Sequence, residues 1–308
     1  MGICYSEVKL LAAEAKERKF TGTVATLGRQ HVYVTESEAK AVYEQCGLPQ
    51  SSTKWSLHRD PTLASNGYVS DDCLLTGLGF DRVVRIDVDD YEQVDEILDL
   101  NSATTPDHLL QAFDAIIDFG TLEHVYHVPN AMSHISRMIR PFGRVIHMLP
   151  ASNCVEHGFY SFSPTFIRDH YLAAKYQIKQ LLLCKLPKRF ERNAWTLYEY
   201  PIEYRDSFPL GRLGRGTFVI FAIVIAPDSP MVGLTPQQGF YSRTWAETSD
   251  SNSFADSKSK AARFISMFRE GARSQRVALF VVSQWRSLRR WLSRIAEGPV
   301  PLKRVGKL

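Results

Sequence analysis

The fold is decided by residues 113–150, FDAIIDFGTLEHVYHVPNAMSHISRMIRPFGRVIHMLP. The stretch begins with the apolar run FDAIID, which ends at Asp118, and it finishes with a second apolar run, RVIHML, that a proline closes. Between the two runs, apolar residues recur at the spacing of one helix face: they are Val125, Val128, Met132, Ile135 and Ile139. We therefore predict a strand, a helix and a second strand in succession.

The same alternation extends over residues 1–228. Short apolar runs predict seven strands, at residues 23–27, 82–87, 95–101, 113–118, 144–149, 177–184 and 217–228. Helical patterns lie between most of them, with one more helix ahead of the first strand. Continuous apolar strands that alternate with helices are typical of a parallel sheet with both faces covered. We predict an α/β fold with a mostly parallel, seven-stranded, Rossmann-like sheet that finishes in an antiparallel hairpin.

The composition changes after residue 228. Residues 229–256 are rich in Ser, Gly and Pro and predict a linker, and residues 257–308 predict a basic, amphipathic α-helical extension. Residues 251–308 hold 13 Lys/Arg and 3 Asp/Glu, a net charge of +10, whereas residues 1–250 hold 24 and 30, a net charge of −6. A basic amphipathic helix suits a membrane surface or an acidic protein partner. Nucleic acid is an unlikely partner, because the body of the chain is acidic.

The cysteines and the N-terminal residues bear on the cellular setting. The five cysteines are scattered and form no CxxC pair, which argues against a disulfide framework and a structural zinc site. The N-terminal residues lack the basic-then-apolar order of a signal peptide. We expect a cytoplasmic protein that can associate with a membrane through its basic extension.

Polar and small residues follow the predicted strands at the point where each strand ends. In an open parallel sheet, ligands bind at the carboxyl ends of the strands, so these residues are the candidates for a binding site. The candidates in chain order are Gly28, Arg29, Gln30, Asp87, Asp99, Leu100, Asn101, Asp118 and Gly120.

Four of these positions resemble the parts of a nucleoside site. Gly28 would let a ligand approach the backbone closely. Asp87 would accept hydrogen bonds from ribose hydroxyls, although Asp89 and Glu92 are alternatives for this role. Asp99 and Asn101 would meet an adenine amino group, although both residue types also favour turns for their own sake.

Residues 113–150 resemble the post-motif region of class I S-adenosyl-L-methionine (SAM) dependent methyltransferases. The resemblance rests on FDAIID, GTLEHV, RMIRPFGRV and IHMLP in this order, and on the later HGFYSFSPTFIRDHY, which looks like a bacterial subgroup. It spans roughly residues 20–228 and implies a methyltransferase domain with SAM as cofactor. It places Asp118 and Gly120 beside SAM. The family's glycine-rich turn, E-x-G-x-G-x-G, is replaced by TLGRQ, and Arg29 could offset the missing glycines by pairing with the methionine carboxylate.

The resemblance implies transfer of a methyl group, for which we expect a hydroxyl of a small molecule, a sugar or a glycan. A histidine can take the proton of such a hydroxyl. His157 and His124 are the candidates for acid/base or acceptor contacts, and Phe159 and Tyr160 are candidates to line the acceptor side. We expect no metal site, because the histidines and acidic residues show no metal-binding spacing. The alternative is a methyltransferase-like binding or scaffold module that has lost SAM.

Overall fold

The computed structural model describes residues 2–48, 54–202, 213, 215–239, 241–242 and 303–308. Nearly all of them belong to one compact unit, Met1–Glu203, Arg215–Pro236 and Lys303–Leu308. The predicted linker at residues 229–256 and the predicted helical extension lie mainly outside the described residues. No helix in the described ranges is long and apolar enough to cross a membrane.

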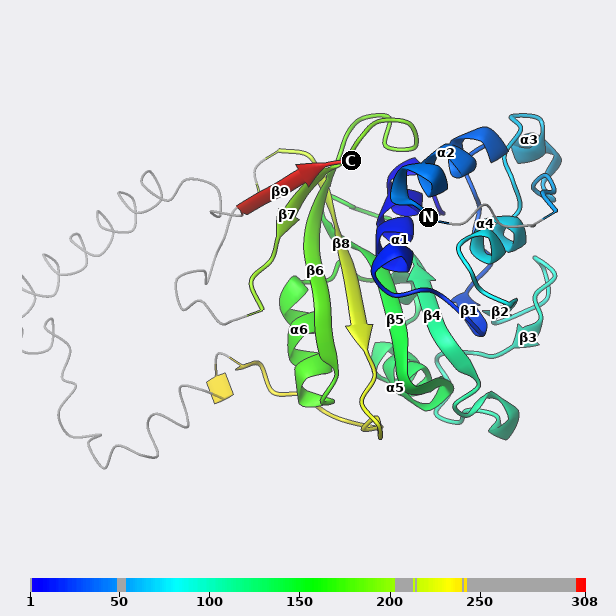
Figure 1. The fold of residues 1–308 in the computed structure, drawn as a ribbon. Coiled ribbons are helices and arrows are strands. Elements are labelled where there is room, and N and C mark those ends of the chain that lie inside the picture. The colour runs from blue at the N-terminus through cyan, green and yellow to red at the C-terminus, as the bar shows by residue number, and fades with distance from the viewer. Residues whose placement is uncertain (1, 49–53, 203–212, 214, 240, 243–302) are drawn as a thin grey trace, which may run out of the picture. The chain divides into compact units, whose positions relative to one another are not determined.

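One nine-stranded sheet organises this unit, in the order β3-β2-β1-β4-β5-β8-β6-β7-β9 (Figure 1). The strands are β1 Thr23–Leu27, β2 Arg82–Asp87, β3 Glu96–Ile97, β4 Phe113–Phe119, β5 Ile139–Ser152, β6 Gln177–Leu186, β7 Thr196–Glu199, β8 Thr217–Ile225 and β9 Lys303–Lys307. The first five strands of the order pair in parallel, and the partial order β3-β2-β1-β4-β5 is that of doubly wound nucleotide-binding folds. The predicted Rossmann-like α/β sheet is therefore confirmed.

The sheet differs from the prediction in size and in strand direction. Strand β8 runs antiparallel to both β5 and β6, and β7 and the edge strand β9 add two further antiparallel pairs. The sheet is mixed and nine-stranded, so the prediction of a mostly parallel, seven-stranded sheet is wrong. The two extra strands are short, and β9, KRVGK, is charged and exposed. Short strands at or next to an edge of the sheet, like these two, carry no apolar run that a sequence pattern could reveal.

Strand β9 also corrects the prediction for the C-terminus. Residues 303–307 were expected to belong to the basic helical extension, but they pair with β7. Leu308 continues this pairing by donating its backbone N–H to the carbonyl of Trp195 at 3.1 Å. The body of the chain therefore includes residues 303–308, while the helical prediction for residues 257–302 lies outside the described part.

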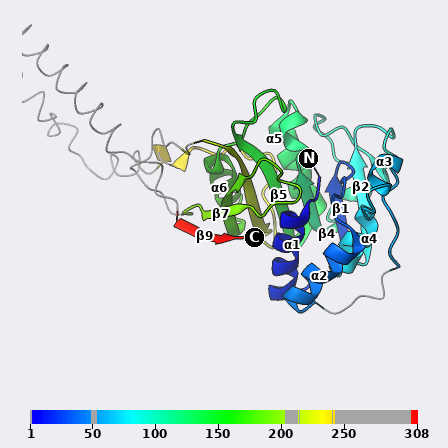
Figure 2. The ribbon, with the colours of Figure 1, turned by 90° about the horizontal axis from the view of Figure 1, so that it is seen from above.

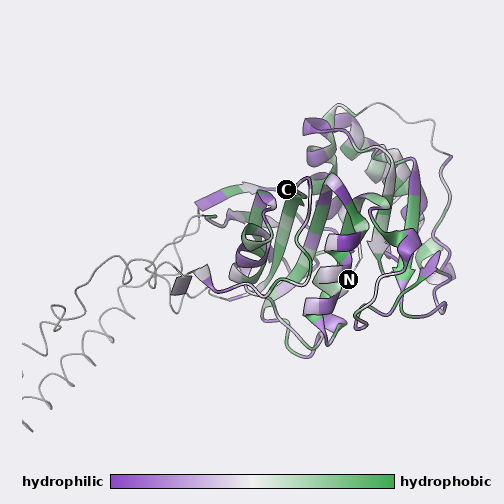
Figure 3. Ribbon diagram, turned by 90° about the horizontal axis from the view of Figure 1, so that it is seen from below, coloured by the Kyte–Doolittle hydropathy of each residue, from purple (hydrophilic) through white to green (hydrophobic). Residues whose placement is uncertain are grey.

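Helices cover both faces of the sheet (Figure 2). They are α1 Tyr5–Glu17, α2 Glu36–Cys46, α3 Pro61–Ala64, α4 Asp71–Gly77, α5 Val128–Met138 and α6 Pro164–Ala173, with 3-10 turns η1 Asp107–Leu109 and η2 Leu122–His124. The first two lie on one face, and α5 and α6 lie on the other. The central strands between them are hydrophobic, as Figure 3 shows. Their continuous apolar sequences follow from being covered on both sides.

Helix α5 forms where the sequence of residues 113–150 predicted it. Its buried face includes Val128, Met132 and Ile135, at the spacing that predicted the helix. Val125 is also buried but precedes the helix, and Ile139 already opens β5. The unit β4–α5–β5 is thus a parallel crossover, and it brings the ends of β4 and β5 to the same edge as the end of β1.

Candidate functional site

The candidate site lies at the carboxyl ends of the parallel strands, where the strand order reverses. Strand β1 lies between β2 and β4. From β1 the chain continues through β2 and β3 on one side, and it then returns to form β4 and β5 on the other side. Doubly wound folds bind ligands at this switch point. The Thr121 hydroxyl donates to the carbonyl of Leu27 at 2.6 Å, which ties the loop after β4 to the end of β1.

Gly28 and Asp87 lie next to each other at this edge. Gly28 has φ +71, and a Cβ atom added to it would lie 3.2 Å from Thr121 Oγ1 and 3.7 Å from a carboxylate oxygen of Asp87. The Gly28 N–H donates to the carbonyl of Ile86 at 2.7 Å, so the turn is held against β2. The backbone of Gly28 therefore has no side chain to cover it, and it lies beside the partly exposed carboxylate of Asp87. This pairing fits the close approach and the hydroxyl acceptor that a nucleoside needs.

Arg29 has a different set of partners from the one expected. Its Nε and Nη2 donate to the carbonyls of Glu92 and Gln93, at 2.7 and 2.6 Å. Its Nη1 lies 3.4 Å from Asp71. These contacts fix the loop between β2 and β3 and commit the guanidinium to the protein itself, so we do not assign Arg29 to the methionine carboxylate.

Asp71, the partner of Arg29, belongs to a charge network whose centre, Asp71 and Arg85, is buried. Arg85 contacts Asp71 at 2.8 Å, Asp72 at 2.6 Å and Asp95 at 3.1 Å. Burial alone would lower the pKa of Arg85, but the hydrogen bonds and charges of the aspartates, Asp71 first, raise it above its usual range. The network joins α4 to β2 and to the loop that follows Asp87. It was not predicted, because its members are dispersed along the sequence.

Gln30 is buried beneath the same turn. Its Nε2 donates to the carbonyl of Leu27 at 3.0 Å, so the side chain closes the turn after β1. Its Oε1 is buried and has no hydrogen-bond partner among the described residues. Gln30 therefore supports the turn from inside.

The residues after β3 form a turn that reaches the start of α5. Asp99 Oδ1 accepts from the backbone N–H of Asn101 at 2.8 Å and from its side-chain amide at 2.9 Å. These two hydrogen bonds hold the pKa of Asp99 below its usual range. Asn101 Oδ1 accepts from the N–H of His127 at 3.0 Å, and Leu100 is buried. The hydrogen bonds within this turn thus explain why Asp and Asn stand at positions 99 and 101. The Asp99 side chain is nevertheless exposed, just after the carboxyl end of β3.

The Asp118 side chain points into the protein and is not exposed at the carboxyl ends of the strands. Its side chain is fully buried, and Oδ1 accepts from the N–H groups of Thr121 and Leu122 at 3.1 and 3.3 Å. Its Oδ2 lies 2.7 Å from Nδ1 of His147, whose Nε2 lies 2.6 Å from the Tyr171 hydroxyl. Since a carboxylate only accepts, we assign the Nδ1 proton to His147, and Tyr171 then donates to Nε2.

This buried chain of three side chains engages Asp118, whose expected position beside SAM stays a prediction. Asp118 orders the loop after β4, and Gly120, with φ +92, lets that loop turn. His147 and Tyr171 were missed as its partners. The signal was a histidine within the apolar run RVIHML, since a buried polar side chain needs a partner.

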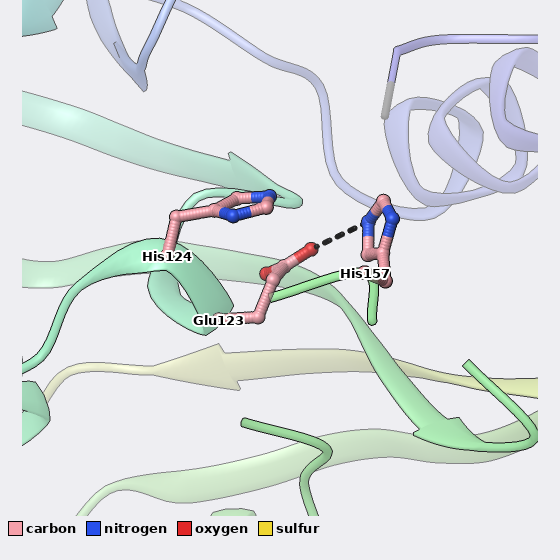
Figure 4. Close-up of side chains that lie close together, drawn as sticks. All are labelled: Glu123, His124 and His157. Carbon is pink, nitrogen blue, oxygen red and sulfur yellow. Dashed lines mark ion pairs between the residues drawn. The ribbon is translucent and has the colours of Figure 1, made fainter. Parts of the chain in front are cut away.

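Glu123, His124 and His157 form a second cluster, which we call the Glu–His cluster (Figure 4). Glu123 is fully buried, and Nε2 of His157 lies 3.3 Å from its Oε1. This contact lacks hydrogen-bond geometry, and both Glu123 oxygens and His157 Nε2 have no hydrogen-bond partner in the described part of the chain. The rings of His124 and His157 meet edge-on with centroids 5.3 Å apart.

Burial dominates the protonation of this cluster. Burial, with a smaller contribution from Asp118, raises the pKa of Glu123 to about 7. Burial and the neighbouring His157 lower the pKa of His124, and burial lowers the pKa of His157. The imidazoles therefore favour their neutral forms, in which each ring has a free lone pair.

The loop after β5 holds His157 against Glu123. The carbonyl of Glu123 accepts from the N–H groups of Phe159 and Tyr160, at 2.7 and 3.2 Å. A Cβ atom at Gly158 would lie 2.7 Å from this carbonyl oxygen and 3.0 Å from Glu123 Cγ. Only glycine allows the loop to approach so closely, and the approach places His157 beside the carboxylate.

The two segments that carry the cluster also carry exposed aromatic side chains. Tyr126 and Phe159 are 63% and 67% exposed, and their rings meet edge-on at 5.7 Å. The Tyr160 hydroxyl donates to the carbonyl of Tyr126 at 2.9 Å. We call these three residues the aromatic patch, and such rings can stack on sugars and flat ligands.

The geometry of this cluster bears on the expectation of no metal site, which stays a prediction. Glu123, His124 and His157 each offer one ligand atom, and the three atoms lie within 4.8 Å of one another. Sequence spacing did not reveal the group, because the loop after β5 brings His157 back to a pair that lies after β4.

Comparison with known proteins adds little to this geometry. No family model matches the sequence. No curated protein matches it either. Among solved structures, 1,6-didemethyltoxoflavin-N1-methyltransferase from Burkholderia thailandensis is similar at a TM-score of 0.37 and 11% identity, over 72% of this chain and 80% of that one. The N-methyltransferase NodS from Bradyrhizobium japonicum WM9 is similar at 0.37 and 11%, over 72% and 94%. Likenesses this weak identify neither a substrate nor a reaction, and the site is interpreted from its own geometry.

Proposed function

We propose that this chain is a SAM-dependent methyltransferase that methylates a hydroxyl group of a small molecule, a sugar or a glycan. One observation carries the proposal. A bare glycine backbone and a carboxylate, at Gly28 and Asp87, share the carboxyl edge of the sheet with the Glu–His cluster. A nucleoside part and a reacting part can therefore be held by the ends of neighbouring parallel strands.

The residues of the first half of the sheet suit the cofactor. Gly28 and Gly120 would let it approach the backbone, Asp87 would accept its ribose hydroxyls, and Asp99 with Leu100 and Asn101 would border its adenine. When bound, SAM supplies an electrophilic methyl group carried on a sulfonium. Arg29, Gln30 and Asp118 support the cofactor site through hydrogen bonds that hold the loops after β1, β2 and β4 in place.

The residues after β4 and β5 suit the acceptor. His157 is partly exposed, at 36% of its side chain, and its Nε2 faces the buried Glu123 carboxylate. A neutral imidazole at this position can take the proton of an acceptor hydroxyl, and an ionised Glu123 stabilises the imidazolium that results. His124 contacts the same acceptor from the other side of Glu123, and the aromatic patch provides a surface for its ring or sugar face.

A second candidate function is a methyltransferase-like scaffold without SAM. The observation that favours it is the turn TLGRQ, in which Arg29 and Gln30 are engaged with the protein. Cofactor binding separates the two candidates, because a scaffold of this kind binds neither SAM nor its demethylated product.

The proposal is tested by measuring S-adenosylhomocysteine release from SAM with a panel of phenols, sugars and lipid-linked glycans. Each acceptor is paired with its fully O-methylated form, which has no free hydroxyl. We expect release only with a free hydroxyl, and a fall in kcat of about a hundredfold or more for His157→Gln. Release with amines but not with hydroxyls would contradict the proposed acceptor class.

A further inference from the structure

The Glu–His cluster contains a buried carboxylate that no Lys or Arg of the described residues neutralises. Glu123 is fully buried, and its two oxygens have no hydrogen bond from any described residue. Within the described ranges, no Lys or Arg pairs with it; the imidazole of His157 lies against it, and the nearby charge is that of another carboxylate, Asp118. Burying a carboxylate without a partner is costly, so the position favours a cation.

The three side chains already approach the geometry of a metal site. Zinc–nitrogen bonds of about 2.1 Å place tetrahedral ligand atoms roughly 3.4 Å apart. The 3.3 Å between His157 Nε2 and Glu123 Oε1 matches this spacing. All three ligand atoms lie within 4.8 Å, so His124 has to move by about an ångström, and its exposed side chain is free to rotate.

We propose that Glu123, His124 and His157 bind one divalent transition-metal cation of the zinc, cobalt and manganese class. Two imidazole ligands with one carboxylate favour these cations over magnesium and calcium, which prefer all-oxygen sites. Three protein ligands leave at least one coordination position open. Catalytic metal sites keep such a position for water or substrate.

The surroundings hold two of the ligands in place before any cation binds. The Glu123 backbone carbonyl is fixed by two N–H groups of the loop after β5, and Gly158 permits this contact. Because His157 precedes Gly158 in that loop, its position relative to Glu123 follows from the same contacts. Ligands fixed in advance lower the entropic cost of binding a cation.

The cation would deepen the proposed function, on which this role rests. A hydroxyl at its open position loses its proton to solvent water more readily, because the cation's charge stabilises the oxygen anion. His157 then acts as a ligand and no longer as the base. The acceptor would be a molecule that presents an ionisable hydroxyl to a metal, beside the aromatic patch.

The test uses the full chain, freed of metals with EDTA and exchanged into metal-free buffer. Co²⁺ is the probe, followed by calorimetry and by its visible absorption. We expect one Co²⁺ per chain, with affinity reduced by about tenfold or more in Glu123→Gln and in His157→Gln. The matched control is His127→Gln, which changes a neighbouring exposed histidine outside the cluster and should bind Co²⁺ like the parent protein. Circular dichroism confirms that each variant is folded.

Two results would overturn the inference. They are the absence of saturable Co²⁺ binding by folded protein, and equal binding by the parent protein and by Glu123→Gln. Calorimetry with SAM in EDTA separates this failure from a failure of the proposed function. SAM binding without Co²⁺ binding would leave the methyltransferase proposal intact and remove the metal, and the opposite pattern would keep the metal site and remove SAM.

Discussion

Replacing Gly28 by alanine isolates the role of the bare backbone at the end of β1. Gly47, which ends α2, is a matched control because it has nearly the same conformation, with φ +70 against +71. An alanine in this left-handed region costs roughly 1–2 kcal/mol at either position. A Cβ atom at Gly47 meets nothing within 4 Å, whereas one at Gly28 lies 3.2 Å from Thr121 Oγ1.

The extra cost at Gly28 is small compared with the stability of a domain. The crowded Thr121 hydroxyl donates to Leu27 at 2.6 Å, and weakening this hydrogen bond adds about 1 kcal/mol. Gly28→Ala should therefore lose roughly 2–3 kcal/mol in all, out of the 5–15 kcal/mol that is typical of a folded domain. At about 2–4 °C per kcal/mol, the Tm should fall by about 4–12 °C for Gly28→Ala and about 2–8 °C for Gly47→Ala.

The two variants should differ much more in cofactor binding than in stability. Thermal unfolding by circular dichroism measures the first effect, and calorimetric titration with SAM at a temperature where both are folded measures the second. We expect Gly47→Ala to bind like the parent protein and Gly28→Ala to bind at least about tenfold more weakly, a loss of about 1.4 kcal/mol or more. Equal SAM affinity in all three proteins would refute the close approach at Gly28.

Three further predictions concern a ligand carboxylate, a buried acid and the basic extension. Asp87→Asn should weaken SAM binding by about tenfold or more with little change in Tm, because charged hydrogen bonds to ribose are lost; a loss confined to Asp89→Asn in the same titration would move the ribose site to that residue. Burial raises the pKa of Glu7 from 4.5 to about 7, so its contribution to stability is present below pH 4.5 and is lost as the pH rises through 7. The free energy of unfolding of Glu7→Gln minus that of the parent protein, both measured with urea, should therefore increase by roughly 3 kcal/mol between pH 4 and pH 8. A difference that does not change with pH would contradict this. Removing residues 257–302 while keeping β9 should abolish sedimentation with anionic vesicles and spare SAM binding, and retention on the vesicles would discard the membrane partner.

The sheet was predictable where a strand is a long apolar run. The predictions for residues 23–27 and 82–87 match β1 and β2 to the residue. The prediction at 95–101 was too long, because only Glu96–Ile97 pairs and the following residues form the Asp99 turn. Strands β7 and β9 were missed, because their pairing depends on the neighbouring strand and not on an apolar pattern of their own.

The site was predictable where backbone geometry alone determines it. The ends of parallel strands meet at one edge, so Gly28 and Asp87 could be placed together without a structure. The direction of a side chain does not follow from this rule. Asp118 stands at the end of its strand, yet it turns inward because His147 on the neighbouring strand offers a buried partner.

The Glu–His cluster was predictable in part. His124 and His157 were each singled out from the sequence, but their grouping around Glu123 depends on the fold of the loop after β5. Gly158 and the N–H groups of Phe159 and Tyr160 determine that fold. Tertiary contacts of this kind, between residues distant in sequence, are invisible to spacing rules.

The most direct test of the account is calorimetric titration of the purified full chain with SAM and with S-adenosylhomocysteine. We expect saturable, micromolar binding of both to one site per chain. Absence of binding by either, on protein that circular dichroism shows to be folded, would contradict it and leave a scaffold whose turn at Gly28 holds no cofactor.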